Sequence, residues 1–330
     1  EASFEEGALA ETLLDIKNLT KHFLLEKAMG RGSEPDVVRA LDGVSFSIEA
    51  GETFGLVGES GCGKSTLGLT VLQLHRPTAG QIIFEDVDLA TMSDNDLKPV
   101  RQRLQMIFQD PYASLDPRMT VGGIIQEPLD IHRVGSRDER RKQVIKLMDM
   151  VGLGSEFVDR YPHEFSGGQR QRIGIARAIA LNPKLIICDE PVSALDVSIQ
   201  VQVLNLLNDL QQELGLTYLF IAHNLAVVAH ISDRIGVMYL GKLIELGSAA
   251  LVTDNPKHPY TQSLLSAVPE IDKRRRKKRI QLTGDVPSPV NPPSGCRFHP
   301  RCPIAKPDCK ENEPEMKQDG SGHWVSCHYA

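Results

Sequence analysis

Hydrophobic residues in the first quarter of the chain follow the two-residue period of β-strands. Apolar or alternating segments are separated by glycine, proline and charged turn residues, which predicts a small antiparallel sheet. The expected strands cover residues 14–23, 37–41, 44–48 and 80–84. Residues 53–57 form a continuous apolar run that predicts a buried strand, and residues 67–74 follow the pattern of a helix.

Between residues 93 and 182 the spacing of apolar residues is mainly that of helices. Residues 137–151 predict an amphipathic helix, because Val144, Leu147 and Val151 recur at intervals of three and four. Another helix is expected to begin at Ser166 and to stop before Pro183.

Strands and helices alternate in the next part of the chain. Residues 185–188 and 217–222 are continuous apolar runs, as in buried parallel strands, and residues 199–214 between them predict a helix. Residues 235–239 and 243–246 predict a hairpin. This alternation predicts an α/β fold with a parallel core sheet.

Composition changes near Asn255, where we expect a domain boundary. Beyond it, proline becomes frequent, a basic run covers Lys273 to Arg279, and four of the six cysteines crowd the end of the chain. The 330 residues leave room for one large core and one or two smaller units. A net charge of −6 does not favour a nucleic-acid partner. We expect neither a transmembrane helix nor a signal peptide.

A glycine-rich segment follows the predicted strand at 53–57 and precedes a helix. It matches the phosphate-binding pattern G-x-x-x-x-G-K-S/T, in which backbone N–H groups and a helix N-terminus surround a polyphosphate. Lys64 is expected to contact the β and γ phosphates of ATP, and Ser65 to bind Mg²⁺. The expected nucleotide-binding residues are Gly58, Ser60, Gly61, Cys62, Gly63, Lys64, Ser65 and Thr66.

Two carboxylates follow the buried strand at 185–188. Ligands of open α/β sheets bind at the carboxyl ends of the strands, so Asp189 is expected to hold Mg²⁺ and Glu190 to polarise the attacking water. The alternative is a helix-capping pair before Pro191.

The segment Ser166-Gly167-Gly168-Gln169 predicts a second anion site at a helix N-terminus. Because the first loop already surrounds one triphosphate, this site is expected to face the γ-phosphate of a nucleotide on another subunit. The alternative is a capping turn whose glycines serve packing.

These motifs, in this order, resemble the ATP-binding subunit of an ABC transporter over residues 14–247. The resemblance implies that Gln109 is the Q-loop glutamine, which contacts Mg²⁺ and water, that His223 contacts the γ-phosphate, and that Phe23 stacks on adenine. It also implies that Ser193 to Asp196 crosses a dimer interface. Two residues depart from the family pattern, Phe165 for leucine and Asn224 for aspartate.

Three further segments are similar to oligopeptide and dipeptide importers, most of all to the oligopeptide F-type ATPase subunit. They cover residues 108–118, 255–261 and 287–296. The resemblance implies a P-loop NTPase fold with an antiparallel β subdomain, an ATP-binding domain over 12–255, a helical subdomain at about 99–169 and a C-terminal extension over 256–330.

The resemblance to these importers also implies the partners and the location of the chain. The partners are a second, non-identical ATPase subunit, two transmembrane permease subunits and an extracytoplasmic peptide-binding protein. The location is the cytoplasmic face of a bacterial plasma membrane, where the chain would be peripheral. The alternative function is a soluble ABC-type ATPase acting on DNA or ribosomes.

The cysteines between residues 296 and 327 indicate a metal site, because disulfides are rare in the cytosol. The expected ligands are Cys296, Cys302, Cys309 and Cys327. Four thiolates can bind Zn²⁺ or a 4Fe–4S cluster. The resemblance favours iron–sulfur, and free thiols or a ligand from His299 or His328 are the remaining alternatives. The basic run at 273–279 is either a solvated linker or attracted to an anionic membrane face.

Overall fold

The structure is a computed structural model that describes residues 11–25, 36–267 and 280–330. The basic run at 273–279 lies outside these residues. Within the described ranges, no helix is long and apolar enough to cross a membrane.

An eight-stranded sheet forms the centre of the molecule, in the order β11-β12-β10-β9-β3-β8-β7-β6. The strands from β9 to β6 run parallel, and β10 and β12 are added antiparallel. The bounds are β3 Thr53–Val57, β6 Leu104–Ile107, β7 Leu185–Asp189, β8 Thr217–Ala222, β9 Arg234–Tyr239, β10 Lys242–Ser248, β11 Lys317–Gln318 and β12 Trp324–Val325. The expected parallel α/β core is therefore present, and so is the expected hairpin, as β9 and β10.

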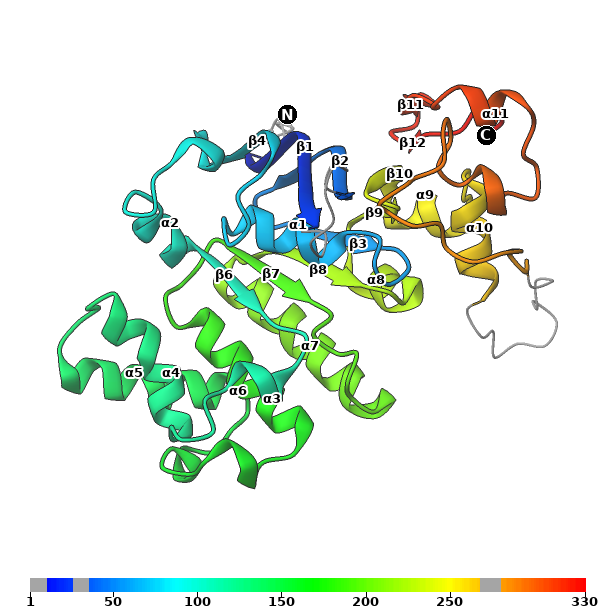
Figure 1. Cartoon of the computed structure of the whole chain (residues 1–330). Helices are drawn as coiled ribbons and strands as arrows, with labels where there is room; N and C mark the ends of the chain where they lie inside the picture. Colours follow the sequence, from blue (N-terminus) through cyan, green and yellow to red (C-terminus); the bar gives the residue numbers. More distant parts are fainter. Residues whose placement is uncertain (1–10, 26–35, 268–279) are drawn as a thin grey trace, which may run out of the picture.

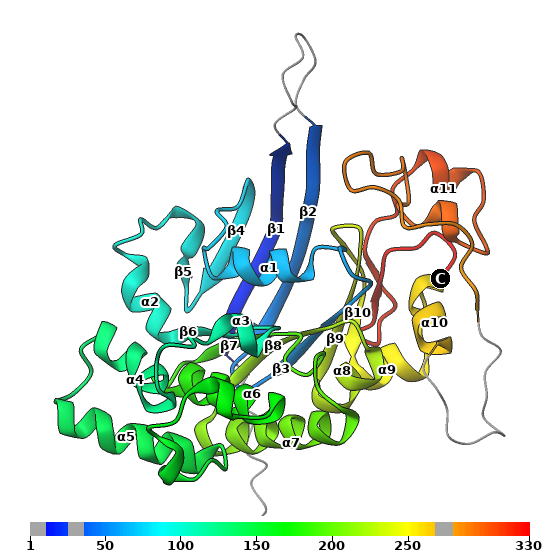
Figure 2. The same cartoon turned by 60° about the horizontal axis from the view of Figure 1, so that its bottom comes forward.

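A four-stranded antiparallel sheet covers one side of this core, in the order β2-β1-β4-β5. Its strands are β1 Thr12–Leu25, β2 Asp36–Glu49, β4 Ala79–Phe84 and β5 Val87–Asp88. The two segments expected at 37–41 and 44–48 form one strand, β2, which pairs with β1 through several register shifts. Figure 2 shows β1 and β2 as a long hairpin that extends beyond the sheet.

The helices that precede β7 divide into two sets. α1 (Lys64–Val71) and α2 (Leu97–Arg103) pack under the antiparallel sheet, and α3 (Pro111–Ser114), α4 (Val121–Ile131), α5 (Arg137–Met150) and α6 (Gly167–Ile179) form a separate helical region (Figure 1). The later helices are α7 Val197–Leu214, α8 Leu225–Ile231, α9 Ala249–Asp254, α10 Pro259–Ser266 and α11 Asp308–Glu311.

One strand lies where the sequence pattern predicted helix. β6 (Leu104–Ile107) directly follows α2 and pairs in parallel with β7 as the last strand of the core sheet. Leu104, Met106 and Ile107 are buried. A four-residue apolar run satisfies the spacing of a buried helix as well as that of a strand, so only pairing with β7 decides between them.

Alternate residues of the core strands face opposite hydrophobic clusters. In β7, Ile186 and Cys188 belong to the cluster beneath α4 to α7, whereas Leu185 and Ile187 face α1 and the antiparallel sheet. The last part of the C-terminal extension, residues 280–330, is orange to red in Figure 1 and lies beside β10, and its Phe298 packs in the first of these clusters.

Candidate nucleotide-binding site

The phosphate loop connects β3 to α1 in a conformation that depends on glycine. Gly61 and Gly63 have φ values of 80° and 108°, in the left-handed region that glycine adopts most readily. A Cβ at Gly63 would also lie 2.2 Å from the carbonyl oxygen of Ala40. Because α1 begins at Lys64, its unpaired N–H groups and positive end point toward the loop.

Lys64 makes hydrogen bonds within the loop, and Ser65 connects the loop to Asp189 of β7. The buried Lys64 ammonium donates to the carbonyl oxygens of Gly58 at 2.7 Å and Glu59 at 3.1 Å. The Ser65 hydroxyl donates to Oδ1 of Asp189 at 3.0 Å. A hydroxyl beside a carboxylate is a donor set that suits Mg²⁺, so the structure brings the two expected magnesium ligands together.

Asp189 lies at the carboxyl end of β7, where it is buried. Burial raises the pKa of its carboxyl group, and the nearby charge of Glu190 acts in the same direction. The hydrogen bond from Ser65 opposes this shift. A carboxylate that burial destabilises gains most from a cation placed next to it.

Glu190 contacts Gln109 and His223, two site residues that the resemblance to ABC transporters implied. The Nε2 of Gln109 donates to Oε2 of Glu190 at 3.1 Å, and Nδ1 of His223 lies 3.1 Å from the same oxygen. Glu190 itself has a φ of 46°, and its backbone N–H donates to the carbonyl of Ile221 in β8. Two side chains that are distant in sequence therefore converge on one carboxylate oxygen of Glu190.

A cavity of about 570 Å³ contains this arrangement. Ten of the expected site residues line it, namely Phe23, Ser60, Gly61, Gly63, Lys64, Ser65, Thr66, Gln109, Glu190 and His223. Three lining residues were not expected: Val38 and Ala40 of β2, and Pro289 of the C-terminal extension. Gly58, Cys62 and Asp189 do not line the cavity, although Asp189 contacts it through Ser65.

The predicted second anion site, Ser166 to Gln169, lies outside this cavity. Ser166 caps α6, and its hydroxyl accepts from the N–H of Gln169 at 3.3 Å while Gln169 Oε1 accepts from the N–H of Ser166 at 2.9 Å. This is a capping box. None of the residues from Ser166 to Gln169 lines the cavity. A Cβ at Gly168 would lie 2.5 Å from Ile199 of α7, so this glycine also serves packing.

The four cysteines of the extension lie near one another. The backbone N–H of Cys296 donates to the carbonyl of Cys309 at 2.8 Å, and all four thiols are free. Burial, and then the neighbouring thiols, raise the pKa of Cys296 to about 11; the pKa values of Cys302 and Cys327 are raised too. Among the described residues, no three metal-binding side chains converge as metal ligands would. The structure therefore does not support the expected iron–sulfur or zinc site, which stays a hypothesis.

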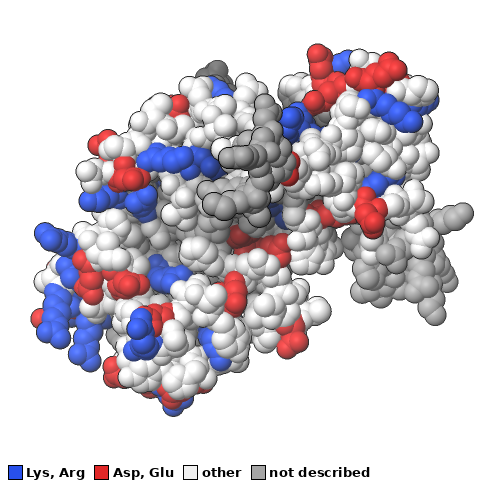
Figure 3. Space-filling view, in the orientation of Figure 1, with Lys and Arg blue, Asp and Glu red and all other residues white. Residues whose placement is uncertain are grey.

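Charged side chains are mixed over the surface that Figure 3 shows, with lysines and arginines gathering over α5.

Comparisons with protein families match two parts of the chain. The family described as "ABC transporter" matches residues 41–193, and the family described as "Oligopeptide/dipeptide transporter, C-terminal region" matches residues 244–309. The second match includes the segment at 255–261, on which the resemblance to peptide importers partly rested.

Several relatives are similar over nearly the whole chain. The oligopeptide transport ATP-binding protein AppF of Bacillus subtilis is 56% identical, with 98% of each chain covered. The dipeptide transport ATP-binding protein DppF of Haemophilus influenzae is 50% identical, with 96% of each chain covered.

Solved structures give the same fold. The ATP-binding cassette MJ0796, in a dimeric post-hydrolysis state bound to ADP and Pi, has a TM-score of 0.63 at 30% identity, covering 72% of this chain and 98% of its own. CbiO1 of Clostridium perfringens, part of the transporter complex cbiONQ, has a TM-score of 0.64 at 26% identity, covering 74% of this chain and 92% of its own.

Proposed function

The chain belongs to the family of ATP-binding subunits of oligopeptide and dipeptide ABC transporters, and from this premise we propose that it couples ATP hydrolysis to the uptake of short peptides. The observation that carries the proposal is the convergence of Gln109 and His223 on Glu190, beside Lys64 and Ser65, in one cavity. The tail matches a transporter region, which disfavours the alternative of a soluble ATPase on DNA or ribosomes.

The phosphate loop would hold ATP through its backbone N–H groups and through Lys64. Ser65 and Asp189 would hold Mg²⁺, with Gln109 as a further ligand; the ion would neutralise phosphate charge. Phe23 and Val38 line the same cavity and would offer apolar surface to the adenine.

Glu190 is the base in this proposal. Its carboxylate orients a water molecule and accepts a proton while the water oxygen bonds to the γ-phosphorus. The bond between that phosphorus and the β–γ bridging oxygen breaks, which gives ADP and inorganic phosphate. His223 and Gln109 hold the carboxylate oxygen at 3.1 Å, so they keep Glu190 directed toward the γ-phosphate position.

The assembly would contain a second, non-identical ATPase subunit, two permease subunits and an extracytoplasmic peptide-binding protein. It would place this chain peripherally on the cytoplasmic face of a bacterial plasma membrane. The position of Ser166 outside the chain's own cavity supports a composite site, in which α6 meets a nucleotide bound by the partner ATPase.

An iron–sulfur cluster bound by the four cysteines between residues 296 and 327 is a separate hypothesis, which the proposed transport function does not require. Its support is the proximity of the four free thiols, and the lack of converging ligands among the described residues is against it. Analysis of anaerobically purified protein decides the matter. About four iron and four sulfide per chain would support the cluster, one zinc would replace it, and neither would remove the metal hypothesis.

Peptide uptake in the source bacterium tests the function itself. Deleting the gene should abolish uptake of a labelled oligopeptide while uptake of the free amino acids continues. Wild-type protein should restore it, whereas the Lys64→Ala variant should not, because its phosphate loop lacks the cation. Unchanged peptide uptake in the deletion strain, with every other peptide transporter removed, would contradict the proposal.

A further inference from the structure

The C-terminal extension reaches the phosphate loop through Arg301, an arginine whose side chain is largely covered. The guanidinium of Arg301 donates from Nη1 to Oε2 of Glu59 at 2.8 Å and from Nη2 to Oε1 at 3.1 Å. Only 9% of the Arg301 side chain and 28% of the Glu59 side chain are exposed. Paired bonds of this kind fix both the direction and the distance of the carboxylate.

The backbone of the same loop residue is held by another part of the extension. Tyr260 of α10 accepts a hydrogen bond from the N–H of Glu59 at 2.8 Å. Its ring is fully buried, 4.8 Å from the ring of Tyr239 and 5.5 Å from that of Phe298. Glu59 is therefore fixed at its side chain and at its N–H by residues beyond the core of the ATP-binding domain.

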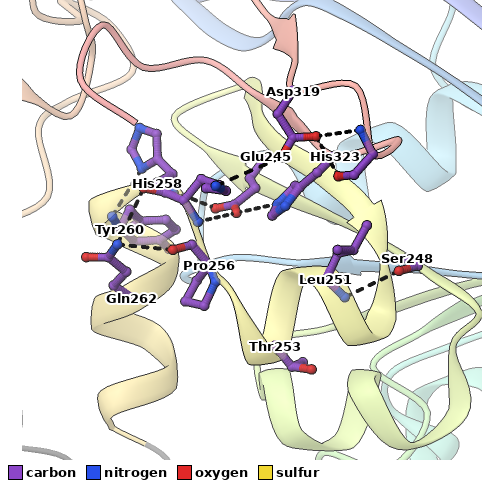
Figure 4. Close-up of polar contacts among 12 residues, drawn as sticks. Glu245, Ser248, Leu251, Thr253, Pro256, His258, Tyr260, Gln262, Asp319 and His323 are labelled. Atoms are coloured by element: carbon purple, nitrogen blue, oxygen red, sulfur yellow. Dashed lines mark hydrogen bonds and ion pairs between the residues drawn. The ribbon is translucent and has the colours of Figure 1, made fainter.

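The start of α10 is itself anchored by a buried carboxylate. Figure 4 shows Glu245 of β10 beside His258 and His323. Glu245 accepts from the N–H groups of Lys257 and His258 at 2.7 and 3.0 Å, and Nε2 of His323 lies 2.7 Å from its Oε1. Because Glu245 and His323 are fully buried, this network holds Tyr260 in a fixed position against the loop.

Glu59 also contacts Lys64, the lysine that is proposed to bind phosphate. The carbonyl oxygen of Glu59 accepts from the Lys64 ammonium at 3.1 Å. The contacts run from Arg301 to Glu59 and from Glu59 to Lys64. A shift of Glu59 would therefore move both the loop backbone and the Lys64 ammonium, the two groups that meet the nucleotide.

We propose that Arg301 is a positioning residue for nucleotide binding, which acts through Glu59 and makes the affinity for ATP depend on the docked C-terminal extension. This inference rests on the proposed function, because it requires that the phosphate loop binds ATP. It goes beyond that function in making the extension, and not only the ATP-binding domain, part of the nucleotide site.

The test measures binding of Mg-ATP and Mg-ADP to the full chain by calorimetry. The Arg301→Gln variant should raise both dissociation constants about tenfold, which corresponds to ~1.4 kcal/mol. The dissociation constants of both nucleotides should rise, because both nucleotides place phosphates in the loop. In the Glu59→Gln background the same change should have a smaller effect, since the charge and the paired geometry of the contact are already lost.

Arg297→Gln is the matched control. Arg297 is a buried arginine of the same segment, but it pairs with Asp42 and the Leu240 carbonyl and contacts no phosphate-loop residue. The Arg297→Gln variant should have a lower thermal stability, and its dissociation constants for Mg-ATP and Mg-ADP should be unchanged. The single tryptophan, Trp324 of β12, reports by its fluorescence whether the extension remains docked.

If the fluorescence shows that Arg301→Gln releases the extension, the binding measurement uses the Arg301→Lys variant instead. Lysine keeps the positive charge and loses the paired geometry. Three results would overturn the inference: wild-type affinity in the docked Arg301 variant, an equal loss in Arg297→Gln, or an undiminished effect in the Glu59→Gln background. If the wild-type chain bound no ATP, the proposed function itself would fail.

Discussion

At the scale of single residues, the site depends on how one carboxylate is held. Glu190 has a left-handed backbone, and its Oε2 contacts both Gln109 and His223. An unusual backbone conformation that a non-glycine residue keeps is characteristic of functional sites. The neighbouring Asp189 faces Ser65 instead, so two adjacent carboxylates have separate roles.

Replacing Glu190 with glutamine should separate binding from hydrolysis. Glu190→Gln keeps the shape of the side chain and removes the proton acceptor, so kcat should fall about 10²- to 10⁴-fold. The dissociation constant for ATP should change little, because Lys64 and Ser65 are untouched. Single-turnover hydrolysis with labelled ATP measures the chemical step, and a chemical step as fast as that of wild type would exclude Glu190 as the base.

Most residues of the nucleotide site could be predicted from the sequence, whereas Val38 and Pro289 could not. Lys64 and Ser65 lie in a local motif whose spacing fixes its geometry. Val38 and Pro289 enter the cavity from a neighbouring strand and from the extension. The Arg39 N–H bonds the Pro289 carbonyl at 3.1 Å, a contact between segments far apart in sequence that no local pattern encodes.

At the scale of elements, the amino end of α6 is a capped helix terminus outside the chain's own nucleotide cavity. Its first turn contains no acidic residue, and the capping box uses Ser166 and Gln169. The exposed positive end of such a helix attracts an anion. Capping and phosphate binding are compatible here, so the packing role of Gly168 does not exclude a role in a composite site.

A charge placed at Ser166 should distinguish these roles. Ser166→Asp retains an N-cap acceptor, so stability and ATP binding of the isolated chain should stay within about 0.5 kcal/mol of wild type. Its negative charge should repel the partner's γ-phosphate, and ATPase activity of the assembled transporter should fall.

Ser166→Asn is the neutral control of nearly the same size, and it should retain most activity. Loss of ATP binding by the isolated Ser166→Asp chain would show that Ser166 belongs to the nucleotide site of its own chain. Full activity of the assembled Ser166→Asp transporter would remove the composite site.

Strong hydrophobic periodicity allowed most helices and strands to be predicted. The shortest strands could not be predicted, because they form only through pairing with neighbouring strands. The helix expected at 137–151 is α5, and the strand expected at 217–222 is β8. β6 was wrongly expected to be helical, because its four residues carry too little pattern to oppose the helical spacing around them. β12 has two residues and is a strand through its pairing with β10 and β11.

At the scale of the whole molecule, the extension continues the core sheet and shares a hydrophobic cluster with it. β12 pairs with β10, and Tyr260 and Phe298 pack with residues of the parallel strands. Composition near Asn255 indicated a boundary, but composition cannot show how two units pack. The boundary at 255 stays a prediction, and the contacts across it give the extension a place beside the nucleotide.

The buried His258 should make stability depend on pH. Burial lowers its pKa to about 3, and Nδ1 accepts from the N–H of Tyr260 at 3.1 Å, which requires the neutral ring. The unfolded chain binds a proton near pH 6.5 that the folded chain does not, so stability should fall as pH decreases below 6.5. The slope from this residue is at most ~1.4 kcal/mol per pH unit.

Urea unfolding between pH 7.5 and about 5 measures this slope. His258→Asn keeps a capping acceptor and cannot titrate, so its stability should depend less steeply on pH. Equal slopes for both proteins would show that His258 is not responsible.

The central claim is that hydrolysis at this chain's site drives peptide import. Proteoliposomes that contain the permease subunits, the partner ATPase and this chain, with Mg-ATP on the cytoplasmic side, test it most directly. Addition of peptide and binding protein should stimulate ATP hydrolysis and accumulate peptide, and Glu190→Gln in this chain should greatly reduce both. Undiminished peptide accumulation with Glu190→Gln, or hydrolysis that peptide never alters, would contradict the account.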